Sequence, residues 1–255
     1  MDISALFTLL GLTQLLSLTI MEIVLGIDNV IFISILTGKL PKKDQGKART
    51  MGLSMALIFR IGLLFGISWI ISLQAPLFAL EDLGIDYDFS LSGRDLILLF
   101  GGLFLTYKSV GEIMEKFHPE EIDEDEDQKG MSLPAAIAQI VLLDIVFSID
   151  SILTAVGMVD NVYIMIGAVI IALMIMLSFS GAISDFVNDN PNIKMLALCF
   201  LVLVGFKLVA EALHQHIESG YLYAPIGFSI VVETLNMLAK KSEEKRAAKE
   251  NEHKV

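Results

Sequence analysis

The sequence contains a single cysteine, Cys199, which lies within an apolar run. One cysteine excludes an intramolecular disulfide and a cysteine metal cluster. Basic residues are also few, with 18 Lys and Arg against 30 Asp and Glu, and no basic patch suggests binding of nucleic acid. Nucleophile motifs, cofactor motifs and phosphate-binding loops are absent from the sequence, so we expect no enzymatic activity and no prosthetic group. The start, Met1-Asp2-Ile3, lacks the basic region of a cleavable signal peptide. We therefore expect the first apolar segment to be retained.

Apolar residues, in contrast, are abundant. They make up 55% of the 255 residues, and the mean hydropathy is +0.69. A soluble domain rarely exceeds about half apolar residues, and several runs here reach the roughly 20 residues that cross a hydrocarbon core. The sequence predicts an all-α membrane protein with a seven-span domain over residues 1–239. The seven transmembrane helices are expected at about 11–37, 50–73, 94–114, 132–158, 162–186, 193–214 and 221–239.

The segments between these spans differ in charge. Residues 39–49 are predicted to form a basic loop, and residues 74–92 a mixed loop that is either exposed or partly re-entrant. Residues 115–131 are predicted to form an acidic, solvated cytoplasmic loop, because they contain a run of carboxylates. A charged cytoplasmic tail is expected over residues 240–255.

The basic residues predict the orientation of the chain, because cytoplasmic loops carry an excess of Lys and Arg. If the first loop is cytoplasmic, only Arg94 falls on the outer side, while Arg60 and Lys207 lie within spans. The N-terminus is then outside and the C-terminus inside. The cytoplasmic side holds Lys39, Lys42, Lys43, Lys47, Arg49, Lys108, Lys116, Lys129, Lys194, Lys240, Lys241, Lys245, Arg246, Lys249 and Lys254.

One stretch occurs twice, each time inside an apolar run. The first copy is Glu22-Ile-Val-Leu-Gly-Ile-Asp-Asn, and the second is Asp144-Ile-Val-Phe-Ser-Ile-Asp-Ser. An acid at the centre of a membrane helix costs about 2.5–3.5 kcal/mol on insertion scales. Four such acids in a matched pattern indicate a function.

The two copies lie in spans that cross in opposite directions, since three helices separate them. A second pair of similar stretches supports the same pairing of halves. These stretches are Tyr107-Lys108-x-x-x-Glu112 and Phe206-Lys207-x-x-x-Glu211. The sequence therefore predicts two inverted three-helix repeats, at about 10–114 and 132–214, with the span at 221–239 as an addition. Secondary transporters use such inverted repeats, with a polar site near the midplane.

Helical geometry leaves two arrangements of the acids open. Residues seven apart on a helix differ by about 20°, whereas residues six apart differ by about 120°. The acids of one motif therefore meet either through local unwinding at Gly26 and Ser148 or in a pocket between several helices. Antiparallel packing of the spans at 11–37 and 132–158 would bring the two motifs together.

The expected ligands are all oxygens, which favour Mn²⁺, Ca²⁺ or Mg²⁺ over Zn²⁺ or Cu⁺. Four carboxylates exceed the charge of one divalent ion, so some must be protonated or paired when the site is empty. This favours exchange of protons for metal. The structural alternative is that the acids hydrogen-bond the backbone and lock two helices. The candidate metal ligands are Glu22, Asp28, Asn29, Asp144, Asp150 and Ser151.

Further polar residues within the spans are candidates for the ion pathway or for charge balance. Arg60 either neutralises the acidic cluster or extends to the membrane surface, and Gln139 is placed to line the same cavity as Asp144. The i,i+4 pairs are either ion pairs near helix ends or pathway residues. Glu233 and Asn236 share a face of the last span and either line an inner vestibule or cap the span. These residues are Lys108 with Glu112, Lys207 with Glu211, and Glu233 with Asn236.

Four stretches resemble the TerC family of bacterial integral membrane proteins over roughly residues 10–239. The resemblance implies a seven-helix fold with inverted repeats in the bacterial cytoplasmic (inner) membrane. It also implies a role in metal-ion homeostasis, chiefly Mn²⁺ efflux, with the six candidate ligands at the positions that bear the ion. The stretches are Glu22-Ile-Val-Leu-Gly-Ile-Asp-Asn-Val-Ile-Phe, Leu143-Asp-Ile-Val-Phe-Ser-Ile-Asp-Ser-Ile, Arg94-Asp-Leu-Ile-Leu-Leu-Phe-Gly-Gly-Leu-Phe and Lys194-Met-Leu-Ala-Leu.

The sequence thus favours an exporter of divalent metal cations, with Mn²⁺ as the transported ion and the lipid bilayer as its surroundings. One alternative is a membrane partner that supports assembly or metallation of envelope or secreted proteins, which would depend on surface loops rather than on buried acids. A weaker alternative is an amino-acid exporter, because four acids without an intramembrane cation beside them would suit a carboxylate substrate badly. The oligomeric state is not predicted.

Overall fold

The computed structural model describes residues 7–79, 90–117, 131–159, 161–218 and 220–252. Within these ranges, seven helices are long and apolar enough to cross a membrane. This confirms the predicted all-α membrane fold with seven spans. The helices are α1 (Leu9–Gly38), α2 (Lys42–Phe65), α4 (Gly93–Phe117), α6 (Leu133–Met158), α7 (Val162–Asp189), α8 (Pro191–Ala212) and α9 (Gly220–Glu252).

Local sequence explains where the helices begin. Thr8 caps α1, since its hydroxyl accepts a hydrogen bond from the Gly11 amide at 3.0 Å, and Ser132 caps α6 in the same way. Asn161 accepts from the Tyr163 amide at 3.0 Å and begins α7. Only Asn190 separates α7 from α8, and Pro191 opens α8, a position where its missing N–H is not needed.

Three connecting segments differ from the prediction. The basic segment 42–49 is the first part of α2 rather than a loop, because its charged residues favour helix when they lie in the aqueous turns before a span. α2 then ends at Phe65, and the short α3 (Ile67–Ser72) follows Gly66. Residues 74–92 were expected to be a loop, but β1 (Pro76–Ala79) and β2 (Ser90–Ser92) form an antiparallel pair.

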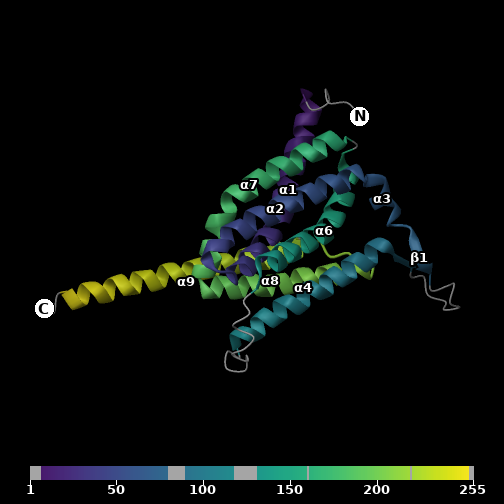
Figure 1. Cartoon of the computed structure of the whole chain (residues 1–255). Coiled ribbons are helices and arrows are strands. Elements are labelled where there is room, and N and C mark those ends of the chain that lie inside the picture. Colours follow the sequence, from purple (N-terminus) through teal and green to yellow (C-terminus); the bar gives the residue numbers. More distant parts are fainter. Residues whose placement is uncertain (1–6, 80–89, 118–130, 160, 219, 253–255) are drawn as a thin grey trace.

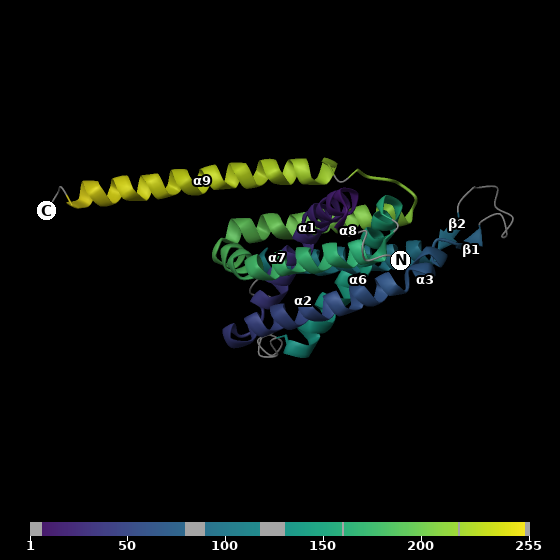
Figure 2. The same ribbon diagram turned by 90° about the horizontal axis from the view of Figure 1, so that it is seen from above.

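The C-terminal segment is also more regular than expected, because α9 continues through the predicted boundary at residue 239 to Glu252. In Figure 1 and Figure 2, the C-terminal half of α9 extends past the other helices, at the end of the bundle opposite β1 and β2. We call the end with β1 and β2 the hairpin end, and the end with Lys39 and Lys42 the lysine end. Most of the predicted acidic loop, residues 118–130, lies outside the described residues.

The helices pair mainly across the two predicted halves. α4 packs most extensively on α8, α1 on α7, and α2 on α6, whereas α1 and α6 share fewer contacts. The direct packing of the two motif helices is therefore smaller than the sequence suggested. If α1, α2 and α4 are exchanged for α6, α7 and α8 in order, the α1–α7 pair becomes the α6–α2 pair and the α4–α8 pair is unchanged. An inverted repeat requires this pattern, and the repeat itself stays a prediction.

Close approach of α4 and α8 depends on two glycines. A Cβ atom at Gly102 would lie 2.6 Å from the Gly205 carbonyl oxygen, and one at Gly205 would lie 2.8 Å from the Gly102 carbonyl oxygen. Neither backbone oxygen can move aside without separating the helices. Small residues at such crossings let membrane helices approach closely in the absence of a hydrophobic driving force.

Candidate functional site

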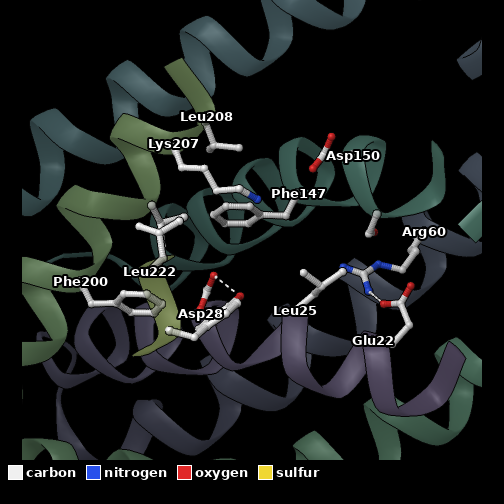
Figure 3. Close-up of a pocket in the computed structure, with 13 residues that line it drawn as sticks. Glu22, Leu25, Asp28, Arg60, Phe147, Asp150, Phe200, Lys207, Leu208 and Leu222 are labelled. Carbon is white, nitrogen blue, oxygen red and sulfur yellow. Dashed lines mark hydrogen bonds and ion pairs between the residues drawn. The ribbon is translucent and has the colours of Figure 1, made fainter. Parts of the chain in front are cut away.

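Arg60 of α2 joins the two repeated motifs inside the bundle. Its Nη1 donates to Glu22 Oε2 at 2.6 Å, its Nη2 to Asp144 Oδ1 at 2.9 Å, and its Nε to Ser148 Oγ at 2.8 Å. All four residues are at most 8% exposed. Figure 3 shows the guanidinium directly beside the Glu22 carboxylate. Arg60 therefore neutralises buried acids and does not extend to the membrane surface.

Hydrogen bonds from polar neighbours also hold the Asp144 carboxylate. Asn29 Nδ2 of α1 donates to Asp144 Oδ1 at 3.0 Å, and Ser148 Oγ, one turn along α6, donates to Asp144 Oδ2 at 3.2 Å. The bond from Nδ2 fixes the orientation of the Asn29 amide, because the donor and acceptor ends of an amide are distinct. Its Oδ1 is buried and has no hydrogen-bond partner among the described residues.

Asp28 stands apart from these acids. α1 and α6 are regular helices through Gly26 and Ser148, so the local unwinding, one of the two arrangements left open by the sequence, does not occur. The spacing of six residues puts Asp28 about 120° around α1 from Glu22. The Tyr223 hydroxyl donates to Asp28 Oδ2 at 3.4 Å, marked by the dashed line at Asp28 in Figure 3. Oδ1 is buried without a hydrogen-bond partner within the described part of the chain.

Asp28 and Asp150 line one small cavity between α1, α6, α8 and α9, which we call the inner cavity. Its volume is about 50 Å³, and Glu22, Ser151 and Lys207 also border it. A water molecule needs roughly 10–15 Å³ by this measure, so the inner cavity has room for a few waters or for an ion that has lost most of its hydration.

A wider cleft of about 670 Å³ adjoins the inner cavity at the hairpin end. Two ion pairs border it: Arg94 binds Asp150, and Lys207 Nζ lies 3.2 Å from Glu211 Oε1. His214 contributes from the end of α8, where its Nε2 lies 3.1 Å from Asp95 Oδ2. The cleft and the inner cavity share four residues, Leu25, Asp150, Lys207 and Tyr223.

A separate charged group lies at the lysine end. Lys39 Nζ is 2.5 Å from Glu112 Oε1 and 2.8 Å from Glu115 Oε2, linking α1 to α4. Burial alone would lower the pKa of Lys39, but hydrogen bonds and charge from Glu112 and Glu115 outweigh it and raise the pKa above the ordinary value. Glu112 thus binds Lys39 of another helix, rather than Lys108 one turn away on its own helix.

The structure places the remaining candidates as follows. Gln139 borders a cavity of about 60 Å³ with Lys39, Lys108 and Glu112, so it does not line the cavity of the acids as expected. Glu233 accepts a hydrogen bond from Asn192 Nδ2 at 2.8 Å, and Asn236 lines the same surface pocket near the lysine end. Ser151 Oγ donates to the Ser148 carbonyl oxygen at 3.3 Å.

The six predicted ligands are brought into one region but not to one point. Among the described residues, no group of three or more His, Cys, Asp or Glu side chains is arranged to hold a metal ion. Instead Arg60 lies between Glu22 and Asp144, Arg94 binds Asp150, and Asp28 faces the inner cavity. A single ion site formed by both motifs stays a prediction.

Three residues of the site were not among the sequence candidates. The sequence does give a reason to select Ser148, because it is a polar residue one turn from Asp144 in the second motif. It gives a weaker reason to select Arg94, as a cation at the start of a span. It gives none for Tyr223, since an aromatic residue at the start of an apolar span is typical of a membrane interface.

Comparison with known proteins gives a consistent result. The model of the "Integral membrane protein TerC family" matches residues 7–248. The chain is 48% identical over 228 residues to the UPF0053 inner membrane protein YoaE of Escherichia coli (strain K12), an alignment that covers 89% of this chain and 43% of YoaE. It is also 48% identical over 224 residues to a UPF0053 protein of Haemophilus influenzae, covering 88% of this chain and 92% of that protein.

The UPF0053 inner membrane protein YgdQ of Escherichia coli (strain K12) is 46% identical over 225 residues, and 92% of its length is covered. The chain thus spans less than half of YoaE and nearly all of the two shorter relatives. No solved structure matches the chain.

Proposed function

Because the chain belongs to the TerC family of integral membrane proteins, we propose that it is a transporter that exports divalent metal cations, with Mn²⁺ as its main cargo. We place it in the bacterial inner membrane, with the hairpin end outside and the lysine end in the cytoplasm. In this proposal the chain is not an enzyme and carries no prosthetic group.

One observation carries the proposal: Asp28 Oδ1 and Asn29 Oδ1, on consecutive residues of α1, are both buried and have no hydrogen-bond partner among the described residues. An unsatisfied buried acceptor costs about 1–3 kcal/mol, and a charged one costs more. Each of these oxygens is an acceptor that a cation or a water molecule can satisfy, because neither has a proton to donate when Asp28 is ionised. Asp28 also borders the inner cavity, where an ion could reside.

The charge of the region supports a divalent cargo. We define the intramembrane charge cluster as the Asp, Glu, Arg and Lys side chains that line the inner cavity or the cleft, together with Asp144, which binds Arg60. Asp95, which lies 4.0 Å from Arg94 and contacts His214, is not counted in it. The cluster contains five carboxylates and three cations, which leave a formal charge of −2 when all are ionised. One divalent cation, or two protons, would neutralise it. The members are Glu22, Asp28, Asp144, Asp150, Glu211, Arg60, Arg94 and Lys207.

The side chains of this cluster have different proposed roles. Arg60 holds Glu22 and Asp144 and offsets one of their two negative charges. Asp28 and Asp150 lie on opposite motifs and border the same cavity, so they are the carboxylates proposed to bind the ion. All available ligands are oxygens, a set that suits Mn²⁺ better than Zn²⁺. Binding of the cation with release of protons would keep the cluster neutral through the cycle.

Three cations lie beside the buried acids, which bears on the amino-acid alternative. No intramembrane cation was expected there when that alternative was weighed from the sequence, yet Arg60, Arg94 and Lys207 all lie beside them. Each of these cations, however, is already bound by a carboxylate of the protein. A substrate carboxylate would have to displace that partner, whereas Asp28 and Asn29 offer a metal ion oxygens that no described residue binds.

The test is uptake of radiolabelled Mn²⁺ into inside-out membrane vesicles, measured with and without a pH gradient and normalised to folded protein. Asp28→Asn and Asp150→Asn keep side-chain shape and remove one charge each. We expect both variants, and the double variant, to lose nearly all uptake at normal abundance. Asp185→Asn, which changes an exposed carboxylate of α7 outside the cluster, is the matched control and should retain uptake.

Three outcomes would contradict the proposal. Full normalised uptake by either single variant would mean that the carboxylates are structural. Uptake of zinc but not of manganese would mean that the ligand argument is wrong. Metal uptake by no form of the protein, with loss of an envelope protein in cells that lack it, would favour the membrane-partner alternative.

A further inference from the structure

The last helix, α9, lies on the outside of the bundle. None of its residues up to Glu243 is buried, and in Figure 2 it runs along one flank beside α8. The side chain of Tyr223 nevertheless extends toward the bundle, since it lines both the inner cavity and the wider cleft. Its ring packs against Phe200 of α8 at a centroid distance of 6.1 Å. A peripheral helix therefore places one side chain between the two spaces.

Four residues border both the inner cavity and the cleft, and we infer that they form the partition between the two spaces. Two of them are fixed by ion pairs, Asp150 by Arg94 and Lys207 by Glu211. Leu25 belongs to the regular helix α1. The polar contact of Tyr223 is the 3.4 Å hydrogen bond to Asp28, well beyond the usual O–H···O distance of about 2.7–2.8 Å. Tyr223 is thus the member of the partition that moves at the lowest cost.

The backbone around Tyr223 points the same way. Pro225 lies inside α9 two residues later. Proline has no N–H, so the helical hydrogen bond from position 225 to the Tyr221 carbonyl cannot form, and the first turn of α9 is held less firmly than the rest. That turn can therefore shift while the remainder of α9 stays in place.

We propose that Tyr223 is the gate between the cleft and the inner cavity. In the closed position its ring separates the two spaces and its hydroxyl occupies Asp28 Oδ2. When it swings away, the spaces join and both oxygens of Asp28 become available to an incoming or departing ion. The identity of that ion rests on the proposed function, whereas the separation of the two spaces by Tyr223 does not. Tyr223 acts through Asp28 and is a positioning residue.

Thiol accessibility tests this without any transport assay. The background is Cys199→Ala, which removes the exposed native cysteine. Val204→Cys places a thiol of similar size in the inner cavity, since Val204 borders that cavity and not the cleft. Thr154→Cys is the matched control, because it borders the cleft alone. Each is treated in whole cells with a membrane-impermeant maleimide, in combination with native Tyr223, Tyr223→Phe or Tyr223→Ala.

We expect Thr154→Cys to be labelled quickly in every background, and Val204→Cys slowly when Tyr223 is present. Tyr223→Ala should bring the rate at Val204→Cys close to that at Thr154→Cys. Tyr223→Phe keeps the ring and loses the hydroxyl, so labelling should rise by about fivefold, the factor that the loss of one weak hydrogen bond gives.

Two results would overturn the gate. One is fast labelling of Val204→Cys with native Tyr223, which would mean that no barrier exists. The other is an unchanged slow rate in Tyr223→Ala, which would place the barrier elsewhere. If labelling follows the gate but Mn²⁺ is not transported, the gate stands and the proposed cargo fails. If Mn²⁺ is transported but the labelling rate does not depend on Tyr223, the proposed cargo stands and the gate fails.

Discussion

Asn29 of α1 donates a hydrogen bond to Asp144 of α6 at 3.0 Å, so the last residue of the first motif contacts the first residue of the second. The reciprocal contact would join Ser151 to Glu22. It is not formed, because Ser151 bonds to its own helix and Arg60 binds Glu22. The two motifs are therefore linked on one side by an amide and on the other by the cation of α2.

Removing the amide tests the first link. Asn29→Ala deletes a buried hydrogen bond to a carboxylate, a change that costs about 1.5–3 kcal/mol for charged partners. We expect a clear decrease in the thermal midpoint of the detergent-purified protein. Asn192→Ala is the control, since its bond to Glu233 is exposed and should leave the midpoint nearly unchanged. Equal midpoints for the two variants would show that the Asn29 bond adds no stability.

Removing the cation tests the second link. Arg60→Gln leaves Glu22 and Asp144 buried without a counter-charge, and breaking a buried pair in this way costs about 3–5 kcal/mol. The amount of folded protein in membranes should fall strongly. Adding Glu22→Gln removes one of the stranded charges and should restore part of that amount, while Mn²⁺ uptake should stay low. Normal abundance of Arg60→Gln alone would contradict the role of Arg60 as the charge-neutralising centre.

Arginine geometry yields a related expectation. Arg60 contacts three side chains through three different nitrogens. Lysine has one ammonium and cannot span the same three partners. Arg60→Lys should therefore be less stable than the native protein in spite of its equal charge, as measured by thermal unfolding in detergent. A native midpoint would mean that charge alone matters at this position.

The α4–α8 crossing predicts a contrast between two glycines of the same helix. Gly102→Ala forces its Cβ onto the Gly205 carbonyl oxygen and should destabilise the protein by about 1–3 kcal/mol, the usual cost of overpacking. Gly111→Ala meets no atom within 4 Å and should be neutral or slightly stabilising, since alanine favours helix. Thermal unfolding of both variants checks this. A destabilised Gly111→Ala with an unaffected Gly102→Ala would contradict the packing.

The orientation is tested by reporter fusions at both ends of the chain. Lys39, Lys116, Lys194 and Lys240 all lie at the lysine end of the bundle, and cytoplasmic segments are enriched in such residues. A reporter that functions only in the cytoplasm should be active after residue 240 and inactive before α1. Activity in the opposite pattern would reverse the proposed direction of the cycle.

The seven spans were predictable because each is a long apolar run, and Gly38 and Asn190-Pro191 mark helix ends in the sequence itself. The hairpin and the helical start of α2 were not, since charged or mixed residues near a membrane surface fit loops and helices equally well. The four motif acids were recognised from their cost in a membrane. Arg60 was recognised as a cation that either neutralises them or extends to the membrane surface. Arg94 and Tyr223 were not recognised as partners, because which helix faces which is decided by distant contacts such as Gly102 with Gly205. Glu22 and Asp28 diverge because α1 stays regular between them.

The pairing of helices across the two halves bears on how the chain is made. α1, α2 and α4 leave the ribosome before α6, α7 and α8, which form their largest interfaces. The first three spans therefore enter the membrane before the helices that cover their largest interfaces have been synthesised. During that interval Arg60 already has Glu22 as a partner from its own half, so a neutral pair can enter the bilayer before Asp144 is synthesised. The order of the chain thus gives Glu22 a counter-charge within its own half and has Arg60 in place before Asp144 is made.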